Sequence, residues 1–417
     1  MGKPLWYTAY RFFERGEGVE LKAENRISFA DKLKSGIILL VSALAIGAIC
    51  GVVGALFAKS IVFVTGLREK NGFLLYLLPL GGLATVGLYK LTKTEGIGTN
   101  RALQSARGEA QTPVILMPVI FASTVITHCF GGSAGKEGAA LQIGSSAAEF
   151  VSKITKADKD KRSVLTVCGM AALFSAAFGT PVGACVFAAE VAVVGSVNVI
   201  AAVPAFVSSV VAYLISIAMG VKPERFHIHS VPAFDVQILL KTLGVAVLVA
   251  LVSAAFCHIL HKSKFLAEKA CKNAFLRIFI GGCIVIILTV IFGKDYNGGG
   301  IAVIERVFET ESVRPEAFLL KILFTAVTVA AGYKGGEIVP SLFIGSTLGG
   351  FLSQFFGLTC GYGAAVGTVA FFSGVTNCPL ASAVIAVELF GVEGFLLFAA
   401  SAFIARAVSG KISLYNE

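Results

Sequence analysis

Residues 131–144 read Gly-Gly-Ser-Ala-Gly-Lys-Glu-Gly-Ala-Ala-Leu-Gln-Ile-Gly, and they interrupt one of several long apolar runs in this chain. Glycines allow backbone N–H groups to turn toward a ligand, and the start of a following helix adds the positive end of its dipole. The break therefore suits an anion, or the carboxylate of Glu137 acting as an internal anion. An ionisable side chain at membrane depth is interpreted first as functional, so Glu137 is the leading candidate site residue.

The composition places the chain in a membrane. Its 417 residues are 56% hydrophobic and only 14% charged, and the mean hydropathy is +0.83. Runs of roughly 20 apolar residues can span a bilayer, and the clearest are 35–64, 73–89, 113–130, 197–219, 236–260 and 275–292. The pattern predicts an all-α polytopic membrane protein.

Glycine or proline breaks other apolar runs at 131–144, 179–183, 332–340 and 376–379. Such breaks are tolerated at membrane depth only where the freed backbone groups face protein or a water-filled cavity. We therefore expect broken helices that surround an internal site.

The formal net charge of +10 lies mainly in short connections, above all at 156–162 and 261–277. Lysine and arginine concentrate in cytoplasmic loops of membrane proteins, so both clusters and the basic segment 1–34 are expected on the cytoplasmic side. We expect contact with membrane lipid and no binding of nucleic acid. Segment 1–34 is polar and lacks the apolar core of a signal peptide.

The chain contains an internal repeat. Residues 135–144 align with 336–345, matching both end glycines and the Leu and Ile between them. A second pair follows in the same order: residues 172–190 align with 370–388, each with an Ala, Phe and Ser, then a Pro, then a final Glu. Duplicated halves with breaks at corresponding places are typical of transporters whose site lies at the repeat interface. The predicted organisation is a segment 1–34, a first repeat 35–220, a connection 221–235 and a second repeat 236–417.

Catalytic and metal-binding patterns are missing from the sequence. The nine cysteines are scattered without a CxxC pair, and neither histidine pair, 227 and 229 or 258 and 261, has an acid or thiol at ligand spacing. The glycines at 298–300 precede no Lys-Ser/Thr, which argues against a nucleotide site. We therefore expect no metal, no cofactor and no enzyme activity.

Four short motifs occur in the order found in one known family. Residues 135–139, Gly-Lys-Glu-Gly-Ala, are similar to a Gly-Arg/Lys-Glu-Gly-Pro motif, and residues 336–340, Gly-Glu-Ile-Val-Pro, to a Gly-x-Phe-x-Pro motif. Gly96-Ile97-Gly98 stands where that family has Gly-Ser-Gly-Ile-Pro, and residues 410–415 resemble the stretch that carries its inner-gate tyrosine. The family is the CLC chloride channels and anion/proton antiporters, and the resemblance covers nearly the whole chain.

The resemblance implies two inverted halves and a homodimer in which each subunit has its own anion pathway. Glu137 would be the gating glutamate, which alternately occupies the anion site and carries a proton. The residues that the resemblance places along the anion pathway are Gly96, Ile97, Gly98, Gly135, Lys136, Gly138, Glu337, Ile338, Val339 and Tyr415.

Departures from the family pattern bear on the ion. Ile97, or Gly98 in a shifted alignment, replaces the serine that contacts chloride in chloride-selective members. Glu337 resembles the acid of the bacterial fluoride/proton antiporter branch, although Val339 stands where that branch has a polar residue. Val191 replaces the internal proton-relay glutamate, which fits the fluoride branch and equally a chloride channel.

The favoured prediction is a fluoride/proton antiporter in a bacterial cytoplasmic membrane. Hydrofluoric acid is a weak acid that an acidic exterior drives into the cell, so export needs coupling to protons. A buried ionised carboxylate costs about 2.5–3.5 kcal/mol at a helix centre, so Glu137 and Glu337 are expected to have a task or a partner. The alternatives are a chloride channel or chloride/proton antiporter of the same family, and an unrelated transporter or receptor with similar breaks.

Several residues also have a plainer interpretation. Glu337 could cap a helix, because acids are favoured at helix N-termini. Glu190 and Glu388 are expected to reach an interface or a polar loop rather than relay protons. Taken alone, Tyr415 would be an interfacial anchor.

Overall fold

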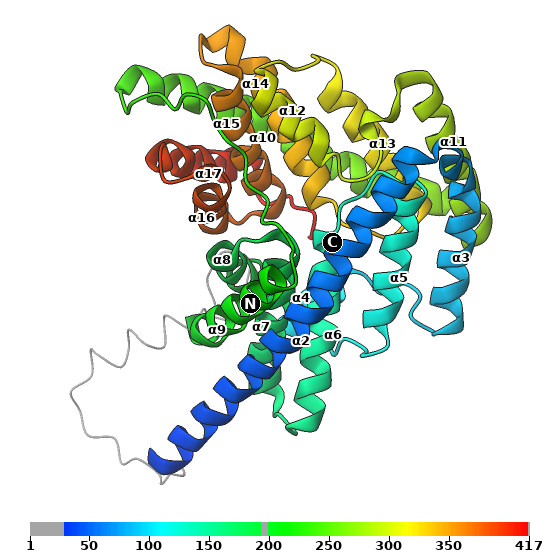
Figure 1. Cartoon of the computed structure of the whole chain (residues 1–417), viewed down its shortest axis with the longest axis vertical. Helices are drawn as coiled ribbons and strands as arrows, with labels where there is room; N and C mark the ends of the chain where they lie inside the picture. Colours follow the sequence, from blue (N-terminus) through cyan, green and yellow to red (C-terminus); the bar gives the residue numbers. More distant parts are fainter. Residues whose placement is uncertain (1–28, 193–198, 416–417) are drawn as a thin grey trace. The chain divides into compact units, whose positions relative to one another are not determined.

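The computed structural model describes residues 29–192 and 199–415 (Figure 1). Most of the predicted segment 1–34 and the first two residues of the predicted span 197–219 lie outside these ranges. The chain divides into the units Met1–Ile38 and Leu39–Glu417, and the candidate site lies in the second.

The fold is all-α, as predicted. The described residues form sixteen α-helices, two 3-10 helices and no strand. In chain order these are α2 Phe29–Lys70, η1 Gly72–Leu77, α3 Leu78–Leu91, α4 Thr99–Ala106, α5 Leu116–Cys129, α6 Glu137–Ile154, α7 Lys159–Phe178, α8 Pro181–Ala192, α9 Val199–Ala218, α10 Val236–Ala270, α11 Ala274–Phe292, η2 Lys294–Tyr296, α12 Ile301–Thr310, α13 Ala317–Ala331, α14 Ile338–Phe356, α15 Cys360–Thr376, α16 Pro379–Phe390 and α17 Phe395–Ser409.

Within the described ranges, seven helices are long and apolar enough to cross a membrane. Five of them contain or closely match predicted spans, but the predicted span 113–130 is wrong, because its helix α5 covers only 14 residues. Two candidate spans were missed, α7 and α14, of which 83% and 78% are buried inside the protein. Because protein rather than lipid surrounds these two helices, they can contain small and polar residues. Those residues lower the mean hydropathy of the helices.

All four predicted breaks separate two helices, and the local residues explain why. Gly179, with φ of 83°, ends α7 in the left-handed conformation, and Pro181 begins α8 two residues later. Asn377, with φ of 61°, ends α15 in the same way before Pro379 opens α16. A left-handed residue that stops one helix and a proline that starts the next are typical of helix boundaries.

The basic turn between α6 and α7 is built by a helix cap. The Asp158 carboxylate accepts a hydrogen bond from the Lys161 backbone N–H at 2.9 Å. This hydrogen bond is the main reason that the pKa of the Asp158 carboxyl lies below its usual value. The cap therefore starts α7 directly after the turn.

Helices α6 and α7 pack so closely that their backbones touch. A Cβ atom placed on Gly144 would lie 2.1 Å from the carbonyl oxygen of Gly169. The same contact occurs between α14 and α15, where a Cβ atom on Gly345 would lie 2.5 Å from the carbonyl oxygen of Gly367. Small residues at helix interfaces permit such approach in membrane proteins. The two repeats therefore share one packing scheme.

Glu190 and Glu388 cap helices of the opposite repeat. The Glu190 carboxylate accepts hydrogen bonds from the backbone N–H groups of Leu380 and Ala381 at 3.2 and 2.8 Å, where α16 begins. The Glu388 carboxylate accepts them from Val182 and Gly183 at 3.0 and 2.7 Å, where α8 begins. Figure 1 shows α8 and α16 as neighbours. The prediction that these acids reach an interface or a polar loop is therefore refined: each satisfies a helix start.

Candidate functional site

The candidate site lies where the broken starts of α6 and α14 meet. The N–H of Gly135 donates to the Gly336 carbonyl at 2.6 Å, and the N–H of Gly336 donates to the Gly135 carbonyl at 2.7 Å. A Cβ atom on Gly138 would lie 2.8 Å from Gly336 Cα. The two helix N-termini, each the positive end of a dipole, therefore converge on one point.

Glu137 is the first residue of α6, and its side chain is fully buried. Its Oε2 atom accepts a hydrogen bond from the backbone N–H of Lys136 at 3.0 Å. Its Oε1 atom has no hydrogen-bond partner among the described residues. The carboxylate thus folds back over the start of its own helix, in the position that an anion would favour.

Lys136 forms an ion pair with the connection between the repeats. Its Nζ atom lies 3.2 Å from Glu224 Oε1, and the two side chains are 11% and 19% exposed. Glu224 belongs to the connection between the repeats, whose Phe226 N–H donates to the Leu389 carbonyl at 2.9 Å. Lys136 therefore ties the start of α6 to that connection.

Glu337 is the residue directly before α14, and it is only partly buried. Its side chain does not cap α14, because it accepts no hydrogen bond from the N–H groups of that helix. A Cβ atom on Gly138 would lie 3.6 Å from Glu337 Oε2, which places this carboxylate against the start of α6. Ile338 and Val339 follow it as buried residues in the first turn of α14.

Three other predicted pathway residues lie at the break before α4. Gly96, Ile97 and Gly98 precede α4, and Ile97 packs against the hydrophobic core. Thr99 opens α4, and its hydroxyl accepts a hydrogen bond from the Gln142 side chain of α6 at 3.2 Å. Gln142 thus links the break before α4 to the helix that begins at Glu137.

Tyr415 is buried in the segment that follows α17. It is 9% exposed, and its hydroxyl has no partner among the described residues. The N–H of Leu414 donates to the Val375 carbonyl at 2.8 Å, which holds this tail against the end of α15. Because the Tyr415 side chain is buried in this tail, the interpretation as an interfacial anchor is wrong.

A cavity of about 1150 Å³ opens onto the start of α6. Gly135, Lys136 and Val339 line it together with the end of α2, residues 220–225 and residues 294–306. Seven cationic side chains outnumber four carboxylates along its wall: Lys59, Arg68, Lys136, Lys222, Arg225, Lys294 and Arg306 against Glu69, Glu224, Asp295 and Glu305. The positive excess favours anions in the cavity.

Sequence reasoning missed Lys321, a fully buried lysine on α13. Its ammonium donates to the carbonyls of Tyr296 and Gly298 at 3.1 and 2.7 Å and lies 5.2 Å from the Phe343 ring centroid. It thereby fixes the glycine-rich loop of the cavity wall. A single lysine inside the apolar run 317–331 was the pattern that could have revealed it.

The comparison with protein families agrees with this geometry. The sequence model described as "Voltage gated chloride channel" matches residues 81–410. The chain belongs to the CLC family. CLC proteins are channels and transporters, which fits the prediction that the chain is not an enzyme.

Individual relatives agree with this assignment. The CLC chain is 30% identical to the chloride/fluoride channel protein of Pseudomonas syringae pv. tomato over 377 residues, 88% of this chain and 83% of that one. Its fold matches the crystal structure of a CLC-type fluoride/proton antiporter with a TM-score of 0.88 at 28% identity, over 93% of this chain and 98% of that one. It also matches the fold of a slow cyanobacterial Cl⁻/H⁺ antiporter, with a TM-score of 0.80 at 19% identity over 91% and 96% of the two chains. This CLC protein is therefore a multi-pass membrane protein of a family of anion channels and transporters.

Proposed function

We propose that this CLC protein exports fluoride in exchange for protons. The observation that carries the proposal is the convergence of the starts of α6 and α14, which are joined through Gly135 and Gly336 and carry the acids Glu137 and Glu337. A solved relative with the same fold is a fluoride/proton antiporter, and it supports this choice of ion.

Glu137 is the gating and proton-carrying group in this proposal. When ionised, its carboxylate occupies the start of α6 and excludes an anion. When protonated, it loses the negative charge that the helix dipole holds, so an anion competes for the same place. Alternation between these states would couple one anion movement to one proton movement.

Backbone N–H groups at the helix starts would hold the anion. Fluoride is small and strongly hydrated, so a site must replace its water with close hydrogen-bond donors. The breaks supply such donors near Gly96, Ile97 and Gly98, near Gly135 and Gly138, and near Ile338 and Val339. Tyr415 adds a hydroxyl donor. Ile97 and Val339 place no hydroxyl of their own in the pathway.

The assembly and location follow the family resemblance. We propose a homodimer in a bacterial cytoplasmic membrane, with the N-terminus and both basic clusters on the cytoplasmic side. The cavity beside Lys136 would then be the outer mouth of the pathway, because residues 220–225 and 294–306 lie at the helix ends opposite those clusters.

Flux measurements in liposomes test the proposal. Purified protein with an outward fluoride gradient is expected to release fluoride faster than chloride and to take up protons at the same time. Glu137→Gln keeps the shape of the side chain but removes its titration, so proton uptake should fall by roughly a hundredfold or more. Undiminished proton uptake in that variant would remove Glu137 from the mechanism.

Chloride transport is the second candidate. Val339 favours it, because this residue does not supply the polar group that the fluoride branch places there. Val191 fits a chloride channel and the fluoride branch equally. Equal initial rates for fluoride and chloride in the same liposomes would select this alternative.

A further inference from the structure

A row of buried polar side chains runs along one face of α6, away from Glu137. Its members recur every three or four positions, which is the spacing of one helix face, with two adjacent serines in the middle, and none is more than 4% exposed: Gln142, Ser145, Ser146, Glu149 and Ser152. The remaining residues of this stretch are alanine, glycine and aliphatic or aromatic side chains. Polar groups are thus gathered on one side of an otherwise apolar helix.

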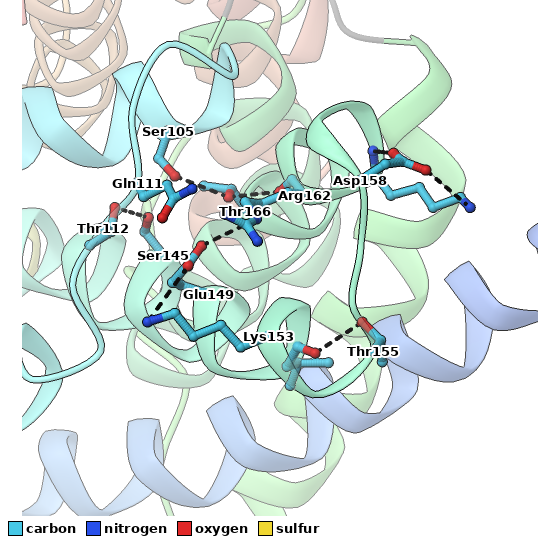
Figure 2. Close-up of polar contacts among 12 residues, drawn as sticks. Ser105, Gln111, Thr112, Ser145, Glu149, Lys153, Thr155, Asp158, Arg162 and Thr166 are labelled. Atoms are coloured by element: carbon cyan, nitrogen blue, oxygen red, sulfur yellow. Dashed lines mark hydrogen bonds and ion pairs between the residues drawn. The ribbon is translucent and has the colours of Figure 1, made fainter.

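Hydroxyl groups from α4 and the connection after it face the row. Gln142 donates to the Thr99 hydroxyl at 3.2 Å. The hydroxyls of Thr112 and Ser145 lie 2.6 Å apart, and either one can donate (Figure 2). Pairs of this kind can reverse their hydrogen bonds, which proton transfer along a row requires.

Glu149 is the acid of this row, and its carboxylate is 1% exposed. Its Oε2 lies 3.6 Å from Arg162 Nε and its Oε1 lies 4.0 Å from Lys153 Nζ, as Figure 2 shows. Neither oxygen accepts a hydrogen bond from the described residues, and the Ser152 hydroxyl is also without a partner there. Most buried polar side-chain atoms have a hydrogen-bond partner, so both Glu149 oxygens are open to a further donor such as a hydroxyl or a water.

The position of Glu149 connects Glu137 with a surface. The two acids are about 18 Å apart at the rise of an α-helix. Lys153, one turn beyond Glu149, is 58% exposed, and the basic turn 156–162 follows. That turn is predicted to face the cytoplasm, so Glu149 lies just beneath the predicted cytoplasmic surface.

We propose that the α6 row is the inner proton path of this protein and that Glu149 is its exit group. The proposal rests on the antiport proposed above, in which protons enter the cell as fluoride leaves. The position that holds a relay glutamate in chloride antiporters is Val191 here, so a proton released by Glu137 needs another route.

The transfer balances without any change of electrons. Glu137 gives up one proton, each hydroxyl or solvent water along the row breaks one O–H bond as it forms the next, and the Glu149 carboxylate accepts the proton. Glu149 then passes it to solvent water at the surface and returns to its ionised form.

Two cations face Glu149: Lys153 from its own helix and Arg162 from α7. The arginines at α4 bond elsewhere, Arg101 to the Gln111 carbonyl and Arg107 to the Ala192 carbonyl. Because the Lys153 side chain is 58% exposed, these cations lie between the buried carboxylate and the surface. That position suits an exit group.

The first test is Glu149→Gln in liposomes with an outward fluoride gradient. The amide keeps the shape but cannot exchange a proton, so proton uptake should fall roughly tenfold to a hundredfold, and the ratio of protons to fluoride should fall with it. The melting temperature and the elution volume in detergent report folding. A normal ratio in this variant, whatever its stability, would overturn the role of Glu149.

A second variant tests the row without replacing the buried carboxylate. Thr112→Val combined with Ser145→Ala removes one hydroxyl pair of the row, and we expect slower proton uptake with a normal melting temperature. Ser208→Ala is the matched control, because Ser208 is equally buried but donates to the Cys168 carbonyl, outside the row. Unchanged proton uptake in the double variant would overturn the row as a path.

The same experiment separates the two proposals. If the wild-type protein moves fluoride without protons, the proposed antiport is wrong, and the proposed proton path is wrong as well. If the wild type couples both ions and both variants do so equally well, only the proton path is wrong.

Discussion

At the scale of single residues, the acids at the starts of α6 and α14 differ in the backbone groups that their side chains contact. Glu137 lies over the start of its own helix and bonds the N–H of Lys136. The Glu337 side chain accepts no hydrogen bond from the N–H groups of its own helix and lies instead against the start of α6. A carboxylate that caps no helix of its own, and lies beside the proposed anion pathway, is more easily explained by transport than by folding.

Glu337→Gln tests this difference. Because no cap is lost, we expect the variant to lose less than the roughly 0.5–2 kcal/mol that removal of a helix cap costs. Removal of the charge should change the fluoride dependence of transport, the proton coupling or both. Flux assays on the folded variant measure this. Wild-type fluxes together with a lowered melting temperature would make Glu337 structural and would remove the main reason to prefer fluoride over chloride.

At the scale of helices, direct backbone contact within each repeat holds the site. The α6–α7 and α14–α15 pairs both cross at glycines, and these pairs carry the two broken starts that meet at Gly135 and Gly336. Any side chain at such a crossing would push apart the helices that position Glu137.

Gly144→Ala is therefore expected to destabilise the protein. The new Cβ atom would lie 2.1 Å from a backbone oxygen that cannot move alone, and overpacking of this kind costs about 1–3 kcal/mol. Gly87→Ala on α3 is the control, because nothing lies within 4 Å of its Cβ position. In that open helical site alanine is expected to be neutral or to stabilise by up to about 1 kcal/mol. The melting temperatures of both variants are measured in detergent. A Gly144→Ala variant with the wild-type melting temperature would contradict this close packing.

At the scale of the whole molecule, the two repeats are joined by reciprocal contacts. Gly135 and Gly336 exchange hydrogen bonds at the centre, and Glu190 and Glu388 each bond the start of a helix in the other repeat. Each contact has a counterpart in the opposite direction, as inverted halves require.

Glu388→Ala should weaken this junction without affecting proton coupling. The N–H groups of Val182 and Gly183 would lose their acceptor, at a cost of about 0.5–2 kcal/mol, and Glu190→Ala should cost a similar amount at α16. Exposed Glu393 provides a neutral control. Melting temperature and the proton-to-fluoride ratio are measured together. Loss of coupling at unchanged stability would instead make these acids proton relays.

The sequence by itself determined the membrane class, the four breaks and the duplication. Hydropathy, the positions of glycine and proline, and a repeated motif can each be recognised from a short stretch of sequence. Their effect on the backbone depends mainly on the few residues around them. Local hydropathy also explains the errors: it overestimated α5, and it missed α7 and α14, whose small and polar residues are covered by protein.

Only the tertiary structure decided which groups meet. The pairing of Gly135 with Gly336, the position of Glu337 against α6 and the crossed caps of Glu190 and Glu388 each join residues about 200 positions apart. The burial of Glu149 and Lys321 depends in the same way on neighbouring helices and loops. Spacing along the chain reveals which face of a helix a side chain occupies, but the partner on that face is chosen by how the helices pack, because packing brings distant segments within hydrogen-bond distance.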